Sequence, residues 1–287
     1  MIDLHTHTTA SDGRLAPLEL VTRAAGAGVT VISVTDHDTV AALAEVGVEA
    51  AARGIRLVPG IEVTSVADGR DVHMLGYFFN QASLPLLTFL EGQRAQRVSR
   101  VREIGERLER LGMPIDVEAL VSTAALRPGT SVGRPQIARA LVSAGHISSV
   151  QEAFERWLAT GLPAFVPRTG PSPAAVVDVI HAAGGVASFA HPGVTRRDDL
   201  IRPLADHGLD AIEVYHSDHL GEDVQQYRSL AQRLGVLVSG GSDFHGEDPQ
   251  APVEKSRARR STLGAVMLPP DDFAALERRA GEHWHPA

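Results

Sequence analysis

The chain has 287 residues, of which 44% are hydrophobic, with a formal net charge of −8 and a pI near 5.9. This length can bury a large α/β core, and the acidic balance argues against an extended surface for nucleic acid, which normally carries a basic stripe. No apolar run reaches the roughly 18–20 residues that span a bilayer, the start does not resemble a signal peptide and cysteine is absent, so we expect a cytoplasmic protein without disulfides or thiolate metal sites.

Residues 1–82 alternate between β-type and helical segments. The β-branched run at 29–35 is typical of a strand that is buried on both faces, and Gly28 ends the preceding helical segment in the manner of a C-terminal glycine. In chain order we expect a strand at 2–4, a helix at 17–27, a strand at 29–35, a helix at 39–53 and strands at 55–63 and 72–79.

The character of the sequence changes at residue 83. From there to residue 162 the periodicity is helical, with expected helices at 84–111 and near Val117, Ile137 and Val150. The alternation then resumes with a helix at 173–183, a strand at 186–190, a helix near 198–207, a strand at 211–215, a helix at 220–234 and a strand at 236–240. Strands separated by single helices predict right-handed parallel βαβ units. We therefore expect an α/β barrel of seven strands, formed by residues 1–82 and 163–287, with a helical insertion or cap at 83–162.

Imidazole and carboxylate side chains recur where the predicted strands end. In a barrel of parallel strands these ends converge on one mouth, and alternation along a strand lets residues i and i+2 point to the same side. A single His-x-His pair or a lone Glu is weak evidence, and Asp36 or Asp38 is expected to cap the helix that follows. The joint pattern is stronger, because so many buried polar groups are costly without a cation. The predicted metal ligands are His5, His7, Asp12, His37, Glu62, His73, His191, Asp243 and His245.

The predicted ligands offer nitrogen and oxygen but no sulfur, a set that fits Mn²⁺ best, with Fe²⁺ or Zn²⁺ as alternatives. Nine ligands are too many for one ion, so two or three divalent ions are expected. Clustered ions lower the pKa of a bound water and neutralise phosphate oxygens, which suits phosphoryl transfer. His216, at the end of the sixth strand, and His219 are candidates to protonate the leaving oxygen or to contact the substrate.

The motifs resemble those of the PHP (polymerase and histidinol phosphatase) family. They are HTHTTASDG at 5–13, TDHDT at 35–39, GIEVT at 60–64, His73, AHP at 190–192 and GGSDFHG at 240–246. The resemblance implies a distorted seven-stranded TIM-like barrel. It also implies how three ions would share the ligands: one bound by His5, His7, Glu62 and Asp243, a second by Glu62, His73 and His191, and a third by Asp12, His37 and His245.

Within that family the chain is similar to short stand-alone members that have a helical insertion. These are associated with nucleoside 3′,5′-bisphosphate phosphatase activity and with 5′-to-3′ trimming of 5′-phosphorylated RNA. In them a segment like 131–135 (SVGRP) supplies an arginine to the substrate phosphate, and here that residue is Arg134, whose guanidinium can fork onto two phosphate oxygens. Gln136 stands where a histidine is expected, which puts any role of that histidine in doubt.

We therefore expect a metal-dependent phosphoric ester hydrolase in which a metal-bridging hydroxide attacks the phosphate of a nucleotide or of a short 5′-phosphorylated RNA. The expected catalytic residues are Asp243, His191, Arg134 and His216, and the expected substrate contacts are Arg134, His216 and His219. Histidinol-phosphate phosphatase is the alternative reaction, and a non-catalytic metal-binding module is the alternative of another class. We expect no membrane association and no obligate protein partner.

Overall fold

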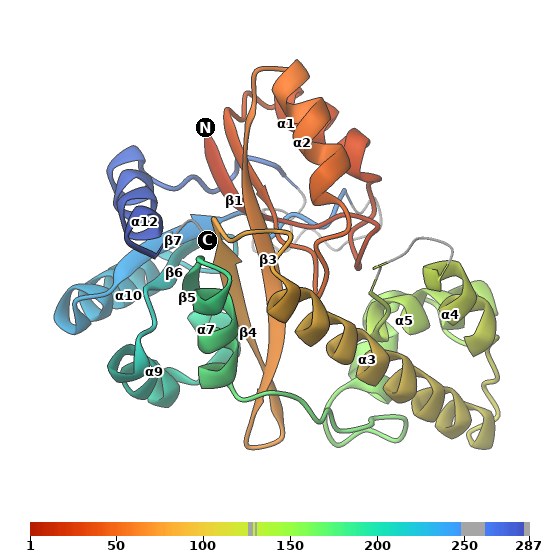
Figure 1. Cartoon of the computed structure of the whole chain (residues 1–287). Helices are drawn as coiled ribbons and strands as arrows, with labels where there is room; N and C mark the ends of the chain where they lie inside the picture. The colour runs from red at the N-terminus through yellow and green to blue at the C-terminus, as the bar shows by residue number, and fades with distance from the viewer. Residues whose placement is uncertain (126–128, 130, 248–261, 284–287) are drawn as a thin grey trace.

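A computed structural model of the chain describes residues 1–125, 129, 131–247 and 262–283. Its seven strands form one sheet in sequence order, and a parallel bridge between Thr6 and Phe244 brings the two edges together into a barrel (Figure 1). The predicted seven-stranded α/β barrel is thus confirmed. The strands are β1 (Ile2–Thr6), β2 (Val31–Val34), β3 (Arg56–Ala67), β4 (Arg70–Tyr77), β5 (Val186–Phe189), β6 (Ala211–His216) and β7 (Leu237–Gly241).

One strand runs against the others. β4 pairs antiparallel with both β3 and β5, whereas the remaining neighbours are parallel, so the expectation of parallel units throughout was wrong. β3 and β4 form a hairpin whose two-residue loop is Asp68–Gly69, with φ values of 51° and 73°. An Asp-Gly pair is the sequence that such a tight turn favours, because both residues need positive φ.

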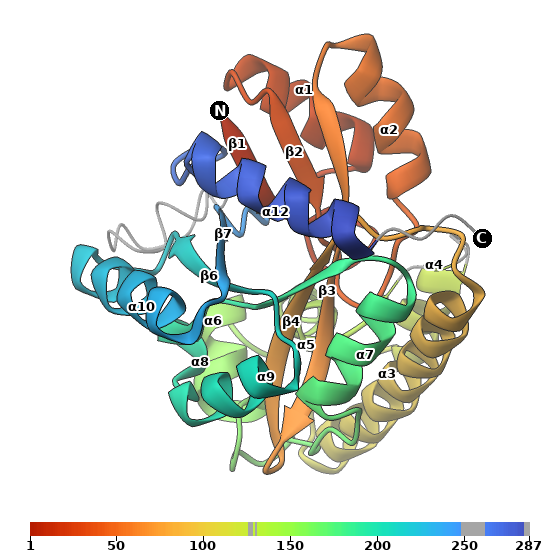
Figure 2. The same ribbon diagram turned by 60° about the vertical axis from the view of Figure 1, so that its left-hand side comes forward.

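Helices cover the outside of the barrel (Figure 2). They include α1 (Pro17–Gly26), α2 (Leu43–Ala52), α7 (Pro173–Ala182), the short α8 (Pro192–Thr195), the 3₁₀ turn η2 (Asp198–Leu200), α9 (Ile201–His207), α10 (Gly221–Leu234) and α12 (Pro270–His283). α12 was not predicted; it buries Phe273 and Leu276 in the barrel core. Among the described residues, no helix is long and apolar enough to cross a lipid bilayer.

The second helix starts later than expected, and neither neighbouring aspartate caps it. α2 begins at Leu43, and its cap position is Ala42, which makes no side-chain cap bond. The Asp36 carboxylate instead accepts hydrogen bonds from the backbone and hydroxyl of Thr8, and Asp38 accepts one from Thr64 N. The two aspartates therefore tie strand ends together, and the expected cap was wrong.

The helical region contains α3 (Leu84–Arg110), α4 (Val117–Ala125), α5 (Arg134–Ser143), α6 (Val150–Ala153) and the π-helical turn η1 (Phe154–Leu158). Leu86 and Leu90 of α3 belong to the barrel core, while Val101 and Ile104 belong to a second hydrophobic core that also contains Ile137. α3 is thus common to both parts and leads away from the barrel toward α4 and α5 (Figure 1). The boundaries of the helical insertion at residues 83 and 162 stay a prediction. Residues 126–128, 130, 248–261 and 284–287, which belong to the predicted insertion and barrel, lie outside the described residues.

Candidate metal centre

The predicted ligands meet at one rim of the barrel, although they are far apart in the sequence. Seven of them (Asp12, His37, Glu62, His73, His191, Asp243 and His245) line a cavity of about 530 Å³. The remaining two, His5 and His7, lie fully buried beneath it. His73 reaches the same rim from the start of its strand, because β4 runs antiparallel to its neighbours.

The deepest group consists of His5, His7, Glu62 and Asp243, whose ligand atoms lie within 4.8 Å of one another. His5 Nε2 is 3.1 Å from His7 Nε2, 3.3 Å from Glu62 Oε2 and 3.3 Å from Asp243 Oδ1, and His7 Nε2 is 3.2 and 3.3 Å from the same two oxygens. Atoms about 2.0–2.2 Å from a common centre in tetrahedral array would be roughly 3.3–3.6 Å apart. The spacing fits a divalent ion.

Three further groups share a residue with the first, and one of them consists of His5, Glu213 and His216. Glu62 belongs to the next, with His37 and His73: its Oε1 is 2.7 Å from His73 Nδ1 and 3.0 Å from His191 Nε2, and its Oε2 is 3.3 Å from His37 Nδ1. The other group gathers His7, Asp12, His37 and His245, in which Asp12 Oδ1 is 3.3 Å from His245 Nε2. His7 Nδ1 and His37 Nδ1 are buried and make no hydrogen bond, although carboxylate oxygens lie 3.7 and 3.3 Å from them. A cation between nitrogen and oxygen would satisfy both.

Three residues of this rim have unusual backbone conformations. Asp38, His191 and Asp243 have φ values of 54°, 27° and 54°, a region that costs a non-glycine residue of order 1–3 kcal/mol. Each follows the end of a strand or of a strand-like segment, where the chain turns sharply toward the cavity. Such strain persists when surrounding contacts fix it, and functional sites are where it concentrates.

The carboxylates and imidazoles of these groups shift one another's pKa values. Burial lowers the pKa of His7, but the hydrogen bonds that its ring donates to the carboxylates of Asp243 and Glu62 raise it to about 10. Burial also lowers the pKa of His37, to about 3. A cation would replace the protons that the carboxylates now attract, because an imidazole must be neutral to act as a ligand.

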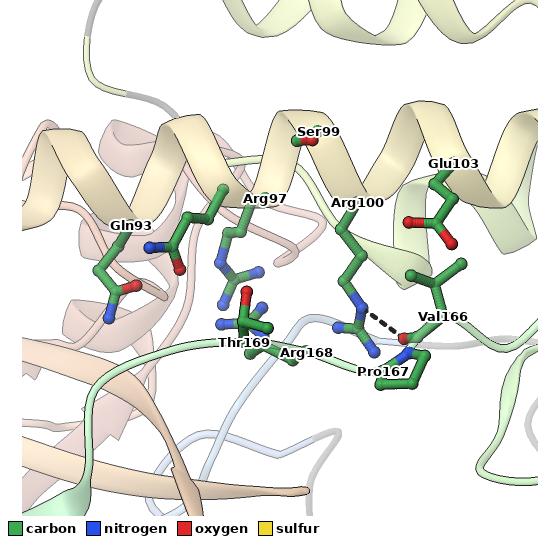
Figure 3. Close-up of a pocket in the computed structure, with 10 residues that line it drawn as sticks. Gln93, Arg97, Ser99, Arg100, Glu103, Val166, Pro167, Arg168 and Thr169 are labelled. Atoms are coloured by element: carbon green, nitrogen blue, oxygen red, sulfur yellow. Dashed lines mark hydrogen bonds between the residues drawn. The ribbon is translucent and has the colours of Figure 1, made fainter.

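Four arginines form a wall on one side of the same cavity, and we call Arg97, Arg100, Arg134 and Arg168 the arginine wall. Arg97 and Arg100 project from α3 toward the segment 166–169 that carries Arg168 (Figure 3). Burial lowers the pKa of both Arg100 and Arg168 to about 10, so these side chains stay charged at neutral pH.

Two carboxylates hold the arginine wall in place. Asp71 Oδ2 is 3.0 Å from Arg134 Nη2, and its oxygens are 3.8–3.9 Å from Arg168 and Arg100. Asp38 pairs with Arg97 and Arg168. Four positive groups thus face two negative ones. Arg100 Nη2 and Arg168 Nε are buried without a hydrogen-bond partner, and the charge and free donors of the wall are features that suit the binding of an anion.

Arg134 is placed by local structure. It is the first residue of α5 after Gly133 and Pro135 follows it, a position at which proline favours a helix start. Its Nη1 also donates to Leu158 O at 3.3 Å. Gln136 accepts from Gly133 N at 2.9 Å and donates to a carbonyl of Ser11, so the residue found in place of the expected histidine links α5 to the loop after β1.

His216 and His219 are buried and their ring nitrogens make internal contacts. His216 Nδ1 accepts from Asp218 N at 3.1 Å, which leaves Nε2 to donate to Asp243 Oδ2 at 3.2 Å. His219 Nδ1 lies 2.8 Å from Val214 O, and its Nε2 accepts from Gly193 N at 3.1 Å. Neither His216 nor His219 is among the described residues that line the cavity.

Several residues of the site were not predicted. Glu213 is fully buried in β6 and bonds to His5 and to the backbone of His191. Asp38, Asp71 and the arginines other than Arg134 were also missed. An acidic residue inside the apolar run of β6 (AIEVYH) was a signal for Glu213, whereas the arginines look like ordinary helix-surface charges in the sequence.

Comparison with known proteins places the chain among phosphoesterases. The model of the PHP domain matches residues 3–160. A 5′-3′ exoribonuclease of Haemophilus influenzae is 37% identical over 248 residues, covering 85% of this chain and 89% of that protein. A 3′,5′-nucleoside bisphosphate phosphatase of Chromobacterium violaceum is 36% identical over 256 residues, covering 85% and 87%. The solved structure of a protein described as a metal-dependent phosphoesterase of Bifidobacterium adolescentis has a TM-score of 0.85 at 30% identity, covering 96% and 95%.

Proposed function

The chain belongs to the PHP domain family of metal-dependent phosphoesterases, and from this premise we propose that it hydrolyses phosphate from nucleotides that carry a second phosphate. The substrates would be nucleoside 3′,5′-bisphosphates and short 5′-phosphorylated RNA. The names of two relatives reported above support this choice: one is a 5′-3′ exoribonuclease and the other a 3′,5′-nucleoside bisphosphate phosphatase.

One observation carries the proposal: seven of the candidate metal ligands and the arginine wall line the same cavity, and His5 and His7 lie buried against those ligands. A substrate with a single phosphate needs only the metal centre. A wall of buried arginines with an excess of positive charge is useful when a second anionic group must be bound beside the first.

The candidate ligands fit two or three divalent ions, with Mn²⁺ as the first choice because the donors are imidazole and carboxylate groups. When bound, such ions would neutralise the phosphate oxygens and lower the pKa of the attacking water. Glu62 contributes to more than one ligand group, and His191 and Asp243 would complete them, so we assign these residues to the metal centre. The proposed ligands remain His5, His7, Asp12, His37, Glu62, His73, His191, Asp243 and His245.

Arg134 would hold the phosphate that is not cleaved, with the rest of the arginine wall supplying positive charge. His216 and His219 receive a different role from the one expected. Because His216 donates to Asp243 and His219 accepts from Gly193, we propose that they fix the rim residues in position. The acid that protonates the leaving oxygen would then have to be a group that lines the cavity.

Histidinol phosphate is a poorer match to this cavity. Its amine is a cation, and it would face the arginine wall, where four positive groups outnumber the carboxylates of Asp38 and Asp71. A bisphosphate has no such conflict.

The test is a comparison of initial rates at saturating Mn²⁺ with adenosine 3′,5′-bisphosphate, histidinol phosphate and a short RNA carrying either a 5′-phosphate or a 5′-hydroxyl. We expect kcat/KM to be highest for the bisphosphate and the 5′-phosphorylated RNA. A preference for histidinol phosphate, or equal rates for the two RNA 5′ ends, would contradict the assignment.

A further inference from the structure

Glu213 lies beneath the metal centre and touches two of its ligands. It stands within β6, its side chain is fully buried, and both of its oxygen atoms accept a hydrogen bond. His5 Nδ1 donates to Oε1 at 2.8 Å, and the backbone N–H of His191 donates to Oε2 at 2.7 Å. Glu213 also clusters with His5 and His216, but both of its oxygens are engaged by N–H groups of two residues that are themselves proposed ligands, which is the arrangement of a carboxylate that orients ligands.

The contact with His5 decides which ring nitrogen is free. A neutral imidazole carries one hydrogen, and the carboxylate of Glu213 keeps that hydrogen on Nδ1. The lone pair of Nε2 then points to His7, Glu62 and Asp243 in the deepest ligand group. The other tautomer would present an N–H to that group and could bind no cation there.

The contact with His191 fixes a strained backbone. His191 has φ 27° and ψ 62°, and the bond from its N–H to Glu213 holds this conformation. In it, Nε2 of His191 lies 3.0 Å from Glu62 Oε1. One carboxylate thus sets the tautomer of a residue in one ligand group and the backbone of a residue in another.

We propose that Glu213 is a positioning residue that couples two ion sites, so that its loss weakens both together. This inference rests on the metal centre of the proposed function but not on the choice of substrate. Carboxylates that orient ligand histidines in this way typically change metal affinity by about 10–100-fold when they are replaced.

The experiment is a Mn²⁺ titration of the full chain, with free Mn²⁺ followed by electron paramagnetic resonance, for the wild type and Glu213→Gln. The amide keeps the size of the side chain but has one acceptor and one donor. Its NH₂ must face either His191 N–H or His5 Nδ1, and in the second case His5 becomes protonated on Nε2. We expect at least two Mn²⁺ ions to bind about 10–100-fold more weakly.

Ser188→Ala is the matched control. It removes a buried hydrogen bond of the barrel, 2.8 Å to Ser239, without touching a candidate ligand. The control should lose stability but keep its Mn²⁺ affinity. Weak binding in both variants would mean that general loosening of the barrel is the cause and would overturn the proposal, as would wild-type affinity in Glu213→Gln.

A second measurement needs no variant at position 213. In the wild-type chain with ¹⁵N-labelled histidine, loaded with Zn²⁺ because it is diamagnetic, the His5 signal (identified by its loss in His5→Gln) should report the Nδ1–H tautomer. The opposite tautomer would refute the role of Glu213 even if Glu213→Gln failed to fold. A wild-type chain that binds Mn²⁺ but cleaves no nucleotide would refute the proposed function and leave both measurements valid.

Discussion

Replacement of Arg134 by alanine tests whether the arginine wall binds the second phosphate of the substrate. A hydrogen bond to a charged group contributes about 1.5–3 kcal/mol, and each 1.4 kcal/mol corresponds to a factor of about ten. Arg134 is already paired with Asp71 at 3.0 Å in the free protein, so binding a phosphate partly replaces an existing contact. The net loss should therefore lie near the lower limit, about tenfold in kcat/KM.

The assay measures phosphate release from adenosine 3′,5′-bisphosphate and from adenosine 3′-monophosphate. If Arg134 holds the uncleaved 5′-phosphate, the loss appears mainly as a higher KM for the bisphosphate and is absent for the monophosphate. Arg134→Lys keeps the charge but cannot form two parallel hydrogen bonds to a phosphate, so its KM for the bisphosphate should lie between those of the wild type and Arg134→Ala. Arg156→Ala, which removes an exposed arginine that pairs with Glu152 in the same helical region, is the control and should leave both rates unchanged.

The reasoning fails if Arg134→Ala slows both substrates equally. Such a result would place the residue at the scissile phosphate or give it a purely structural role. An unchanged KM for the bisphosphate would show that the wall does not contact the second phosphate.

Two other predictions follow from the same geometry. His191→Ala and Asp243→Ala should each abolish turnover while the chain stays folded, since each removes a proposed metal ligand; wild-type rates with either would contradict that role. At Asp38, burial raises the pKa but Arg97 and Arg168 lower it below the ordinary value of 3.8. Its stabilising effect is therefore complete above about pH 4 and is lost as the pH falls through the lowered folded pKa. Urea unfolding should show Asp38→Asn destabilised by about 3–5 kcal/mol at pH 7, with the difference shrinking toward pH 3; a constant difference would exclude the ion pair as its cause.

The barrel, and the meeting of the proposed ligands at one rim, could be predicted from the sequence because both depend on local signals. β-branched runs mark the buried strands, and polar residues that follow them must lie at the rim. The orientation of β4 was missed even though Asp68–Gly69 is a hairpin signal, since the alternation of helices and strands elsewhere favoured parallel units. Asp68 and Gly69 form a tight turn that makes β4 antiparallel to β3, against the parallel arrangement that the alternation predicted.

The arginine wall and Glu213 could not be predicted in the same way. Arg97 and Arg168 are 71 positions apart in the numbering, and only the packing of α3 on the segment 166–169 brings them together. The proposed role of Glu213 depends on its hydrogen bonds to the side chain of His5 and the backbone of His191. Such contacts depend on tertiary register, which a local pattern does not contain.

The antiparallel hairpin also explains how metal centre and arginine wall are linked. Thr64 of β3 lies opposite His73 of β4, and residues two apart on a strand share a face. On β3, Glu62 lies in the metal centre and Thr64 accepts a hydrogen bond from Arg97 at 2.8 Å.

On β4 the same step occurs in reverse. His73 contacts Glu62 at 2.7 Å, and Asp71 pairs with Arg134 at 3.0 Å. On each strand, a candidate metal ligand and a residue that contacts the arginine wall are thus two positions apart. A parallel β4 would carry His73 and Asp71 to the opposite end of the barrel. The reversal of this one strand therefore brings the candidate ligands and the arginine wall to one rim, as the proposed binding of a cleaved and an uncleaved phosphate requires.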